Sequence, residues 1–369
     1  MTPLVHTRLL DLSRLLPGPY ATIILASLGA EVIKIETPLL GDYARQAPPE
    51  FGGDAMFHML NRGKKSLALN YRNQQGRVIF LKLASTADII VETFKPGSMD
   101  KWGLGYDAAK AINPRIIYCA ISGYGQGGPL RNRVGHDLNY IALGGLLGLT
   151  GAAGGPPIPP AVQTADLAGA THAVIAILAA LLQRAQTGEG AYLDIAMLDA
   201  VTQWVLPTAG AIALGGGDPQ RGRMPLTGGA ACNAVYETAD DRHLTLAALE
   251  PPFWNDFCAA VARSDLIPRA FDETAIPEVA AIFRGQDLTF WLDKFRGMEV
   301  PLEPVLTLGE SRAHPQVQAR SSQGAVTPEG HPAPPLGFHT LAILREAGYS
   351  DDEINLWDEK RVIKVIRNS

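Results

Sequence analysis

Strand and helix signals alternate along the first half of the chain, and this alternation restricts the folds that it can adopt. Apolar runs typical of buried strands occupy residues 30–36, 66–70, 87–92 and 115–121. Segments with helical periodicity precede or separate them, at residues 19–28, 74–85 and 106–112. This alternation predicts βαβ units and a mostly parallel sheet. We therefore expect an α/β fold whose ligands bind at the carboxyl ends of the strands.

The length of 369 residues favours two domains, because a single hydrophobic core rarely grows so large. A Gly triplet and a Gly pair within residues 206–230 indicate a linker there. We place the larger domain at residues 1–205 and a smaller α+β domain at residues 231–325. A stretch rich in Pro and Gly follows, and we expect residues 326–369 to return to the large domain.

Charge and cysteine content exclude several classes of function. The net charge of −5 provides no broad basic surface for nucleic acid or for an anionic membrane. The longest apolar run, residues 173–182, is shorter than the roughly 20 residues that span a bilayer. Cys119, Cys232 and Cys258 are an odd number and lie far apart, which argues against a disulfide framework or a structural metal site. We expect a cytoplasmic protein without a bound metal.

A histidine and an aspartate stand out as candidate catalytic groups. His136 follows a glycine-rich loop at residues 123–129, and Asp166 begins a long Ala- and Leu-rich helix. An imidazole and a carboxyl group can remove a proton from one face of a carbon and return one to the other face. Each also has a simpler interpretation, as a hydrogen-bonded loop histidine and as a helix N-cap.

The role of Asp166 depends on its protonation state. The positive end of a helix lowers the pKa of a carboxyl group, whereas a general acid needs a raised pKa, from burial or from a neighbouring carboxylate. The ionised form suffices for a nucleophile. Glu250 follows an apolar strand and precedes Pro-Pro, so it could raise the pKa of Asp166, orient His136, or simply begin a helix.

Several cations follow one another along the βα segments: Lys64, Lys65, Arg72, Lys95 and Lys101. In an acidic protein such a cluster suggests an anionic ligand such as a nucleotide diphosphate, and its alternative is a solvated basic face. The glycine-rich loop lacks the GxGxxG spacing of dinucleotide-binding folds. A nicotinamide cofactor is therefore disfavoured.

Motifs along nearly the whole chain resemble those of the class III CoA-transferase (CaiB/BaiF-like) superfamily. They lie at residues 10–19, 28–36, 61–65, 91–97 and 122–129. Gly-His-Asp-Leu-Asn-Tyr at residues 135–140 looks like the catalytic-histidine motif of the α-methylacyl-CoA racemases within this superfamily. Asp166 falls at the position of the racemase aspartate, which is also that of the transferase nucleophile. Ala-Leu-Glu-Pro at residues 248–251 is similar to the racemase segment that carries a site glutamate.

The resemblance implies an architecture and a site. It implies a Rossmann-like large domain built from both chain ends, a smaller domain between them, and a homodimer of interlocked subunits. It implies a catalytic set of His136, Asp166 and Glu250. The residues expected to contact coenzyme A are Lys64, Lys65, Arg72, Thr93, Lys95, Lys101 and Tyr140. Two of them, Lys95 and Lys101, stand where racemases have arginine, so they would bind phosphate without a bidentate fork.

The implied activity is racemisation of 2-methyl-branched acyl-CoA thioesters, with coenzyme A as part of the substrate and no separate cofactor. N–H groups at the start of the Asp166 helix would stabilise the enolate. The alternative is a CoA-transferase in which Asp166 attacks the acyl-CoA. A CoA-binding protein without catalysis is a third possibility, disfavoured by the presence of both His136 and Asp166.

Overall fold

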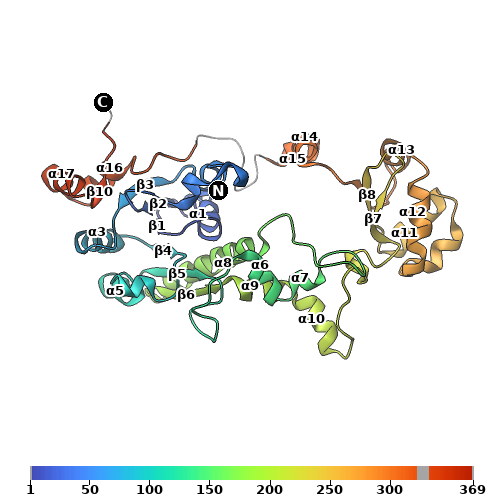
Figure 1. Cartoon of the computed structure of the whole chain (residues 1–369), viewed down its shortest axis with the longest axis horizontal. Coiled ribbons are helices and arrows are strands. Elements are labelled where there is room, and N and C mark those ends of the chain that lie inside the picture. The colour runs from blue at the N-terminus through green and yellow to red at the C-terminus, as the bar shows by residue number, and fades with distance from the viewer. Residues whose placement is uncertain (1, 322–331, 368–369) are drawn as a thin grey trace. The chain divides into compact units, whose positions relative to one another are not determined.

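The computed structural model describes residues 2–321 and 332–367, which form two compact units (Figure 1). Unit 1 comprises the described parts of Met1–Gly144, Ala161–Trp204 and Gln323–Ser369. Unit 2 comprises Gly145–Pro160 and the described part of Val205–Ser322. The expected passage from 231–325 to 326–369 falls within residues 322–331, outside the described residues.

A sheet of seven strands, counted over the described residues, forms the centre of unit 1 in the order β10-β3-β2-β1-β4-β5-β6. The strands are β1 (Arg8–Asp11), β2 (Glu31–Glu36), β3 (Lys65–Leu69), β4 (Ile89–Glu92), β5 (Ile117–Ser122), β6 (Ala191–Ala196) and β10 (Ile363–Lys364). All neighbouring pairs are parallel except β10 with β3. The predicted α/β fold with a mostly parallel sheet is confirmed.

The strand order creates a switch point beside β1. The chain proceeds outward from β1 to β2 and β3 and then returns to place β4 on the other side of β1. The connections after β1 and β4 therefore leave the sheet in opposite directions. Such a switch point is where open α/β sheets commonly bind ligands.

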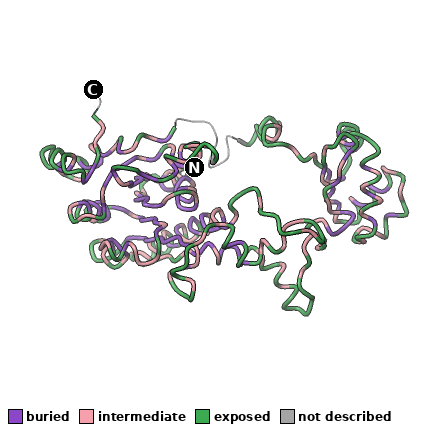
Figure 2. Tube along the Cα trace, viewed as in Figure 1, coloured by how far each residue is buried: buried purple, intermediate pink, exposed green. Residues whose placement is uncertain are grey.

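Helices surround this sheet. They are α1 (Pro17–Ser27), α2 (Ala55–Asn61), α3 (Gln74–Ala84), α4 (Ser98–Lys101), α5 (Tyr106–Ile112), α6 (Asp137–Leu143), α8 (Thr164–Thr187), α9 (Met197–Trp204), α16 (Thr340–Glu346) and α17 (Asp351–Glu359). One apolar core joins strand residues to α3, α16 and α17, so the C-terminal segment is part of unit 1. Figure 2 shows the strands of unit 1 as mostly buried.

The long helix α8 supports the site. It packs against α1, α9 and strands β5 and β6, and its buried positions are mostly alanine. Among the described residues it is the one helix long and apolar enough, by length and composition alone, to cross a membrane. It begins at Thr164, so Asp166 lies in its first turn.

Unit 2 has an antiparallel sheet, β7-β8-β9, covered by helices. Its strands are β7 (Asn233–Glu237), β8 (His243–Ala247) and β9 (Leu302–Pro304). Its helices are α7 (Leu146–Leu149), α10 (Leu206–Ala213), α11 (Pro251–Ala260), α12 (Ile276–Phe283), α13 (Leu288–Lys294), α14 (Leu308–Ala313) and α15 (Pro315–Ser321). Stacked rings of Trp254, Phe257 and Phe295 fill its core. The stretch expected to be a linker, residues 206–230, contains α10 and a short 3₁₀ helix.

Candidate active site

A cavity of about 600 Å³ lies at the switch point of the unit 1 sheet. The connection after β1 contributes Arg14 and Leu15, and the connection after β4 contributes residues 93–96. The loop after β5 adds Gly123 and leads to His136. The cavity is therefore built from the carboxyl ends of adjacent parallel strands.

A second cavity, of about 690 Å³, adjoins the first. Its wall is mainly apolar, with Leu15, Leu16, Leu40, Tyr43, Ala44, Ala47, Pro48 and Met56. The two cavities share Leu15, Tyr43, His136 and Asp166. Both candidate acid–base groups thus lie where a mainly apolar space meets the switch-point cavity.

His136 is the N-cap residue of α6 and is solvent-exposed. Its backbone N–H donates to Oδ1 of Asn139 at 3.0 Å, and its carbonyl accepts from the N–H of Asn139 at 2.8 Å. The hydroxyl of Tyr140, a residue of α6, donates a hydrogen bond to the carbonyl of Gly135. These bonds fix the backbone on both sides of the imidazole, so the start of α6 holds it in place.

Asp166 has an environment that suits a proton donor at neutral pH. Burial raises the pKa of its carboxyl to about 7, and the nearby Asp137 carboxylate adds to the rise. Asp137 accepts hydrogen bonds from the N–H groups of Ala165 at 2.5 Å and Asp166 at 3.2 Å. Burial raises the pKa of Asp137 as well, against the effect of these two N–H groups. Asp166 can therefore exist in both protonation states near pH 7.

The role of Asp137 was not predicted from the sequence. Glu250 was considered as the carboxylate that could raise the pKa of Asp166, but Asp137 is the neighbour that does so within unit 1. Asp137 stands directly after His136 in the racemase-like motif, and this position was the available signal. Glu250 lies in unit 2, as the exposed N-cap residue of α11.

The first cavity is lined by cations, which favour an anionic ligand. They are Arg14, Lys95, Arg131 and Arg133. Of these, only Lys95 was among the residues expected to contact coenzyme A. Thr93 and Tyr140, also expected there, line the same cavity. The two arginines of the loop before His136 could have been noticed from their position alone.

The other expected phosphate ligands lie elsewhere. The ammonium of Lys64 is fully buried and bonds to Asp11 at 3.1 Å and Thr22 at 2.7 Å, so it serves the core rather than a ligand. Lys65 pairs with Glu31. Arg72 stacks on Trp102, with its guanidinium carbon 4.7 Å from the ring centre. These residues and the exposed Lys101 do not line either cavity.

Gly123 provides a test of how tightly the site is packed. A Cβ atom at this position would lie 2.4–2.5 Å from the ring of Tyr140, closer than atoms can approach. Gly123→Ala must therefore displace Tyr140 and the start of α6, and we expect it to destabilise the protein by about 1–3 kcal/mol and to lower activity. Gly127→Ala is the matched control in the same loop, because its Cβ would meet no atom within 4 Å. Equal thermal stability and activity of the two variants would contradict this packing.

Comparisons with known proteins identify relatives that span nearly the whole chain. The α-methylacyl-CoA racemase of Mus musculus is 30% identical, over 97% of this chain and 96% of its own length. The succinyl-CoA:glutarate CoA-transferase of Mus musculus is 34% identical, over 94% and 86% respectively. A CaiB/BaiF family protein of Brucella suis superimposes with a TM-score of 0.81 at 29% identity, over 94% of this chain and 99% of its own.

The sequence profile of CoA-transferase family III matches residues 4–341. This match covers most of both units and confirms the resemblance inferred from the motifs. The chain therefore belongs to CoA-transferase family III.

Proposed function

We propose that this protein is a racemase or epimerase of 2-methyl-branched acyl-CoA thioesters. The observation that carries the proposal is that Asp166 and His136 lie on the wall shared by both cavities, where burial raises the pKa of Asp166 to about 7. A group with this pKa can act as a general acid in one direction and as a base in the other. The similarity to the mouse racemase over nearly the whole chain supports the same activity.

In the proposed reaction His136 removes the α-proton of the thioester and protonated Asp166 returns a proton to the opposite face. The reverse direction exchanges the two roles. The cationic cavity holds coenzyme A and the mainly apolar cavity holds the acyl group, so that binding energy far from the reacting carbon aligns it. Unit 1 alone supplies both groups.

The enolate oxygen also needs a hydrogen-bond donor. N–H groups at the start of the Asp166 helix were expected in this role, but those of Ala165 and Asp166 donate to Asp137. These two N–H groups are therefore already engaged in this structure.

Solvent exchange tests the proposal. A single epimer of a 2-methylacyl-CoA, incubated with the protein in heavy water, should acquire α-deuterium and convert to the other epimer. Absence of both changes across a panel of chain lengths would refute the racemase assignment.

A CoA-transferase is the second candidate, supported by the 34% identity to the succinyl-CoA:glutarate enzyme. In that reaction ionised Asp166 attacks the acyl-CoA carbonyl and expels coenzyme A as the thiolate, giving a mixed anhydride. The thiolate then displaces the carboxylate and leaves an aspartyl-CoA thioester. Hydroxylamine or borohydride trapping distinguishes the candidates, because a covalent adduct at Asp166 would favour the transferase.

Replacing Asp137 by Asn should shift the pH profile of racemisation. The active form of the His136–Asp166 pair carries one proton, so both directions share one bell-shaped profile. Asp137→Asn keeps an acceptor for the two N–H groups but removes the charge that helps to raise the pKa of Asp166. The pKa of Asp166 then falls, and the acid limb of the profile moves to lower pH.

Rates measured between pH 4 and pH 9 check this expectation. Asp351→Asn, which changes an exposed carboxylate paired with Arg345, is the control and should leave the profile in place. An acid limb that stays fixed, or moves to higher pH, in the Asp137→Asn protein would contradict the assignment of Asp166 as the acid.

We further propose that the protein is a homodimer, on the basis of the family resemblance. Light scattering of the purified protein measures its oligomeric state.

A further inference from the structure

Leu15 and Tyr43 line both cavities, yet they come from different segments of the chain. Leu15 belongs to the connection after β1, and Tyr43 begins a short 3₁₀ helix, Tyr43–Gln46, after β2. One buried side chain, Asp42, contacts both segments. This side chain is 1% exposed and does not itself line either cavity.

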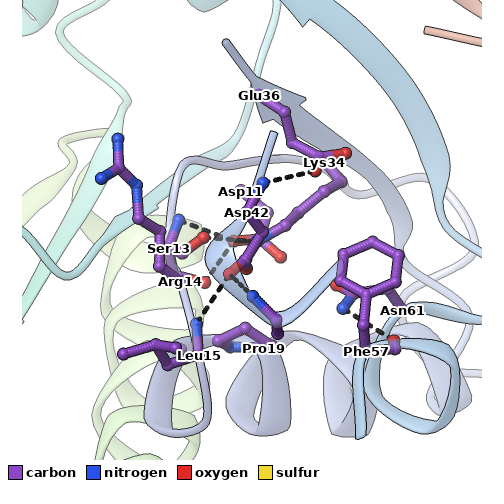
Figure 3. A network of polar contacts seen from close by, with 12 residues as sticks. Asp11, Ser13, Arg14, Leu15, Pro19, Lys34, Glu36, Asp42, Phe57 and Asn61 are labelled. Carbon is purple, nitrogen blue, oxygen red and sulfur yellow. Dashed lines mark hydrogen bonds and ion pairs between the residues drawn. The ribbon is translucent and has the colours of Figure 1, made fainter. Parts of the chain in front are cut away.

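The two oxygens of the Asp42 carboxylate contact different groups (Figure 3). Its Oδ1 accepts a hydrogen bond from the N–H of Leu15 at 3.2 Å. The same oxygen accepts from the N–H of Ala44 at 3.1 Å. Its Oδ2 lies 3.2 Å from the ammonium of Lys34, a buried residue of β2. The carboxylate thus links the two loops through hydrogen bonds, and its contact with Lys34 connects both loops to strand β2.

The backbone of Leu15 has an unusual conformation that the hydrogen bond to Asp42 helps to hold. Its φ angle is +59°, in the left-handed region that residues with a side chain seldom adopt. A backbone of this kind persists only where its surroundings determine it, and such positions concentrate at functional sites. Asp42 holds the N–H of Leu15, while Thr93 of the β4 connection accepts from the N–H of Arg14 at 2.9 Å.

The segment after Asp42 forms a large part of the apolar cavity. Tyr43, Ala44, Gln46, Ala47 and Pro48 all line it. Asp42 caps the first turn of this segment, and its own N–H donates to Glu36 at 2.9 Å. Glu36 also accepts two hydrogen bonds at 2.7 Å from Arg45 of the same segment. The cavity wall is therefore fixed to β2 through two buried carboxylates.

We propose that Asp42 is a positioning residue that sets the wall of the acyl cavity and thereby the enzyme's selectivity for acyl chain length. The proposal rests on the proposed function in that the mainly apolar cavity receives the acyl group. Asp42 touches no substrate; it acts through Leu15 and through residues 43–48. Its loss should weaken the binding of the acyl group and leave the binding of coenzyme A nearly unchanged.

Three variants separate positioning from stability. Asp42→Ala removes the acceptor for both loops. Asp42→Asn keeps an acceptor oxygen for Leu15 and Ala44 but removes the charge that faces Lys34. Thr22→Val perturbs the same buried network, where the Thr22 hydroxyl donates to Asp11 at 2.7 Å and accepts from Lys64, without touching either loop.

The affinities of free coenzyme A, 2-methylbutanoyl-CoA and 2-methyldecanoyl-CoA are measured by calorimetry, with racemisation rates alongside. We expect Asp42→Ala to reduce the ratio of long-chain to short-chain affinity by about tenfold or more, because displaced contacts of an acyl chain have effects of this size. Affinity for free coenzyme A should change little. Asp42→Asn and Thr22→Val should lose thermal stability but keep the wild-type ratio.

An unchanged ratio in Asp42→Ala, or an equal loss in Thr22→Val, would overturn the proposal. If Asp42→Ala does not fold, Leu15→Gly replaces it, because this substitution removes the wall residue and relieves its backbone conformation. An unchanged ratio in Leu15→Gly then overturns the proposal. Failure of the wild-type protein to exchange the α-proton would instead refute the racemase function, since the affinity ratios do not depend on turnover.

Discussion

His136→Ala and Asp166→Ala should each abolish net epimerisation of a 2-methylacyl-CoA, because each direction of the reaction needs both groups. Loss of one general acid–base group lowers a rate by about 10²–10⁴-fold. Each single variant should still exchange the α-proton of the one epimer that faces its remaining base. Mass spectrometry of each pure epimer after incubation in heavy water measures this one-sided exchange.

Matched controls show whether the losses are specific. His172→Ala removes an imidazole that bonds to the carbonyl of Ala168 and to Gln203, and Asp199→Ala removes another carboxylate in the first turn of a helix. Neither lines the two cavities, so both variants should keep wild-type rates. A folded His136→Ala enzyme with wild-type epimerisation would exclude His136 from the mechanism and favour the transferase.

Asp11→Ala should have the largest effect on stability. Asp11 is fully buried and lies 3.9 Å from the buried Lys34 (Figure 3). It also lies 3.1 Å from Lys64, which is buried as well. Removing one partner of a buried ion pair leaves a charge without compensation, at a cost of about 3–5 kcal/mol. Urea unfolding followed by circular dichroism measures the loss. Asp351→Ala, at the exposed ion pair with Arg345, should change the free energy of unfolding far less.

The pKa values in this network give the expected pH dependence. Burial opposes ionisation of Asp11, but Lys34, Lys64 and two hydroxyl groups outweigh it and hold the pKa of Asp11 well below its usual range. Because the pKa is lower in the folded state, Asp11 stabilises the protein above its unfolded pKa of about 4. This stabilisation is lost as the pH falls below that value. An equal acid sensitivity of wild type and Asp11→Ala would contradict the assignment.

Local patterns in the sequence predicted the main elements of unit 1. Buried strands such as β4 and β5 are continuous apolar runs, and the helices between them have a clear period, so neighbouring residues alone predict these conformations. The short strand β1, with Arg8 and Asp11 at its ends, lacks that signal and was not predicted. Its place at the centre of the sheet depends on pairing with β2 and β4.

The sequence by itself determined the α/β class and the candidate pair His136 and Asp166, because periodicity and short motifs depend on neighbouring residues. The tertiary structure decided which charges face a ligand and which face each other. Lys64 reads as a phosphate ligand in the sequence, yet Asp11, 53 positions away, binds it in the core. The pKa of Asp166 likewise depends on burial and on Asp137, 29 positions away. Burial and charge pairing arise between segments that only the folded chain brings together, and therefore the spacing of residues along the chain does not determine them.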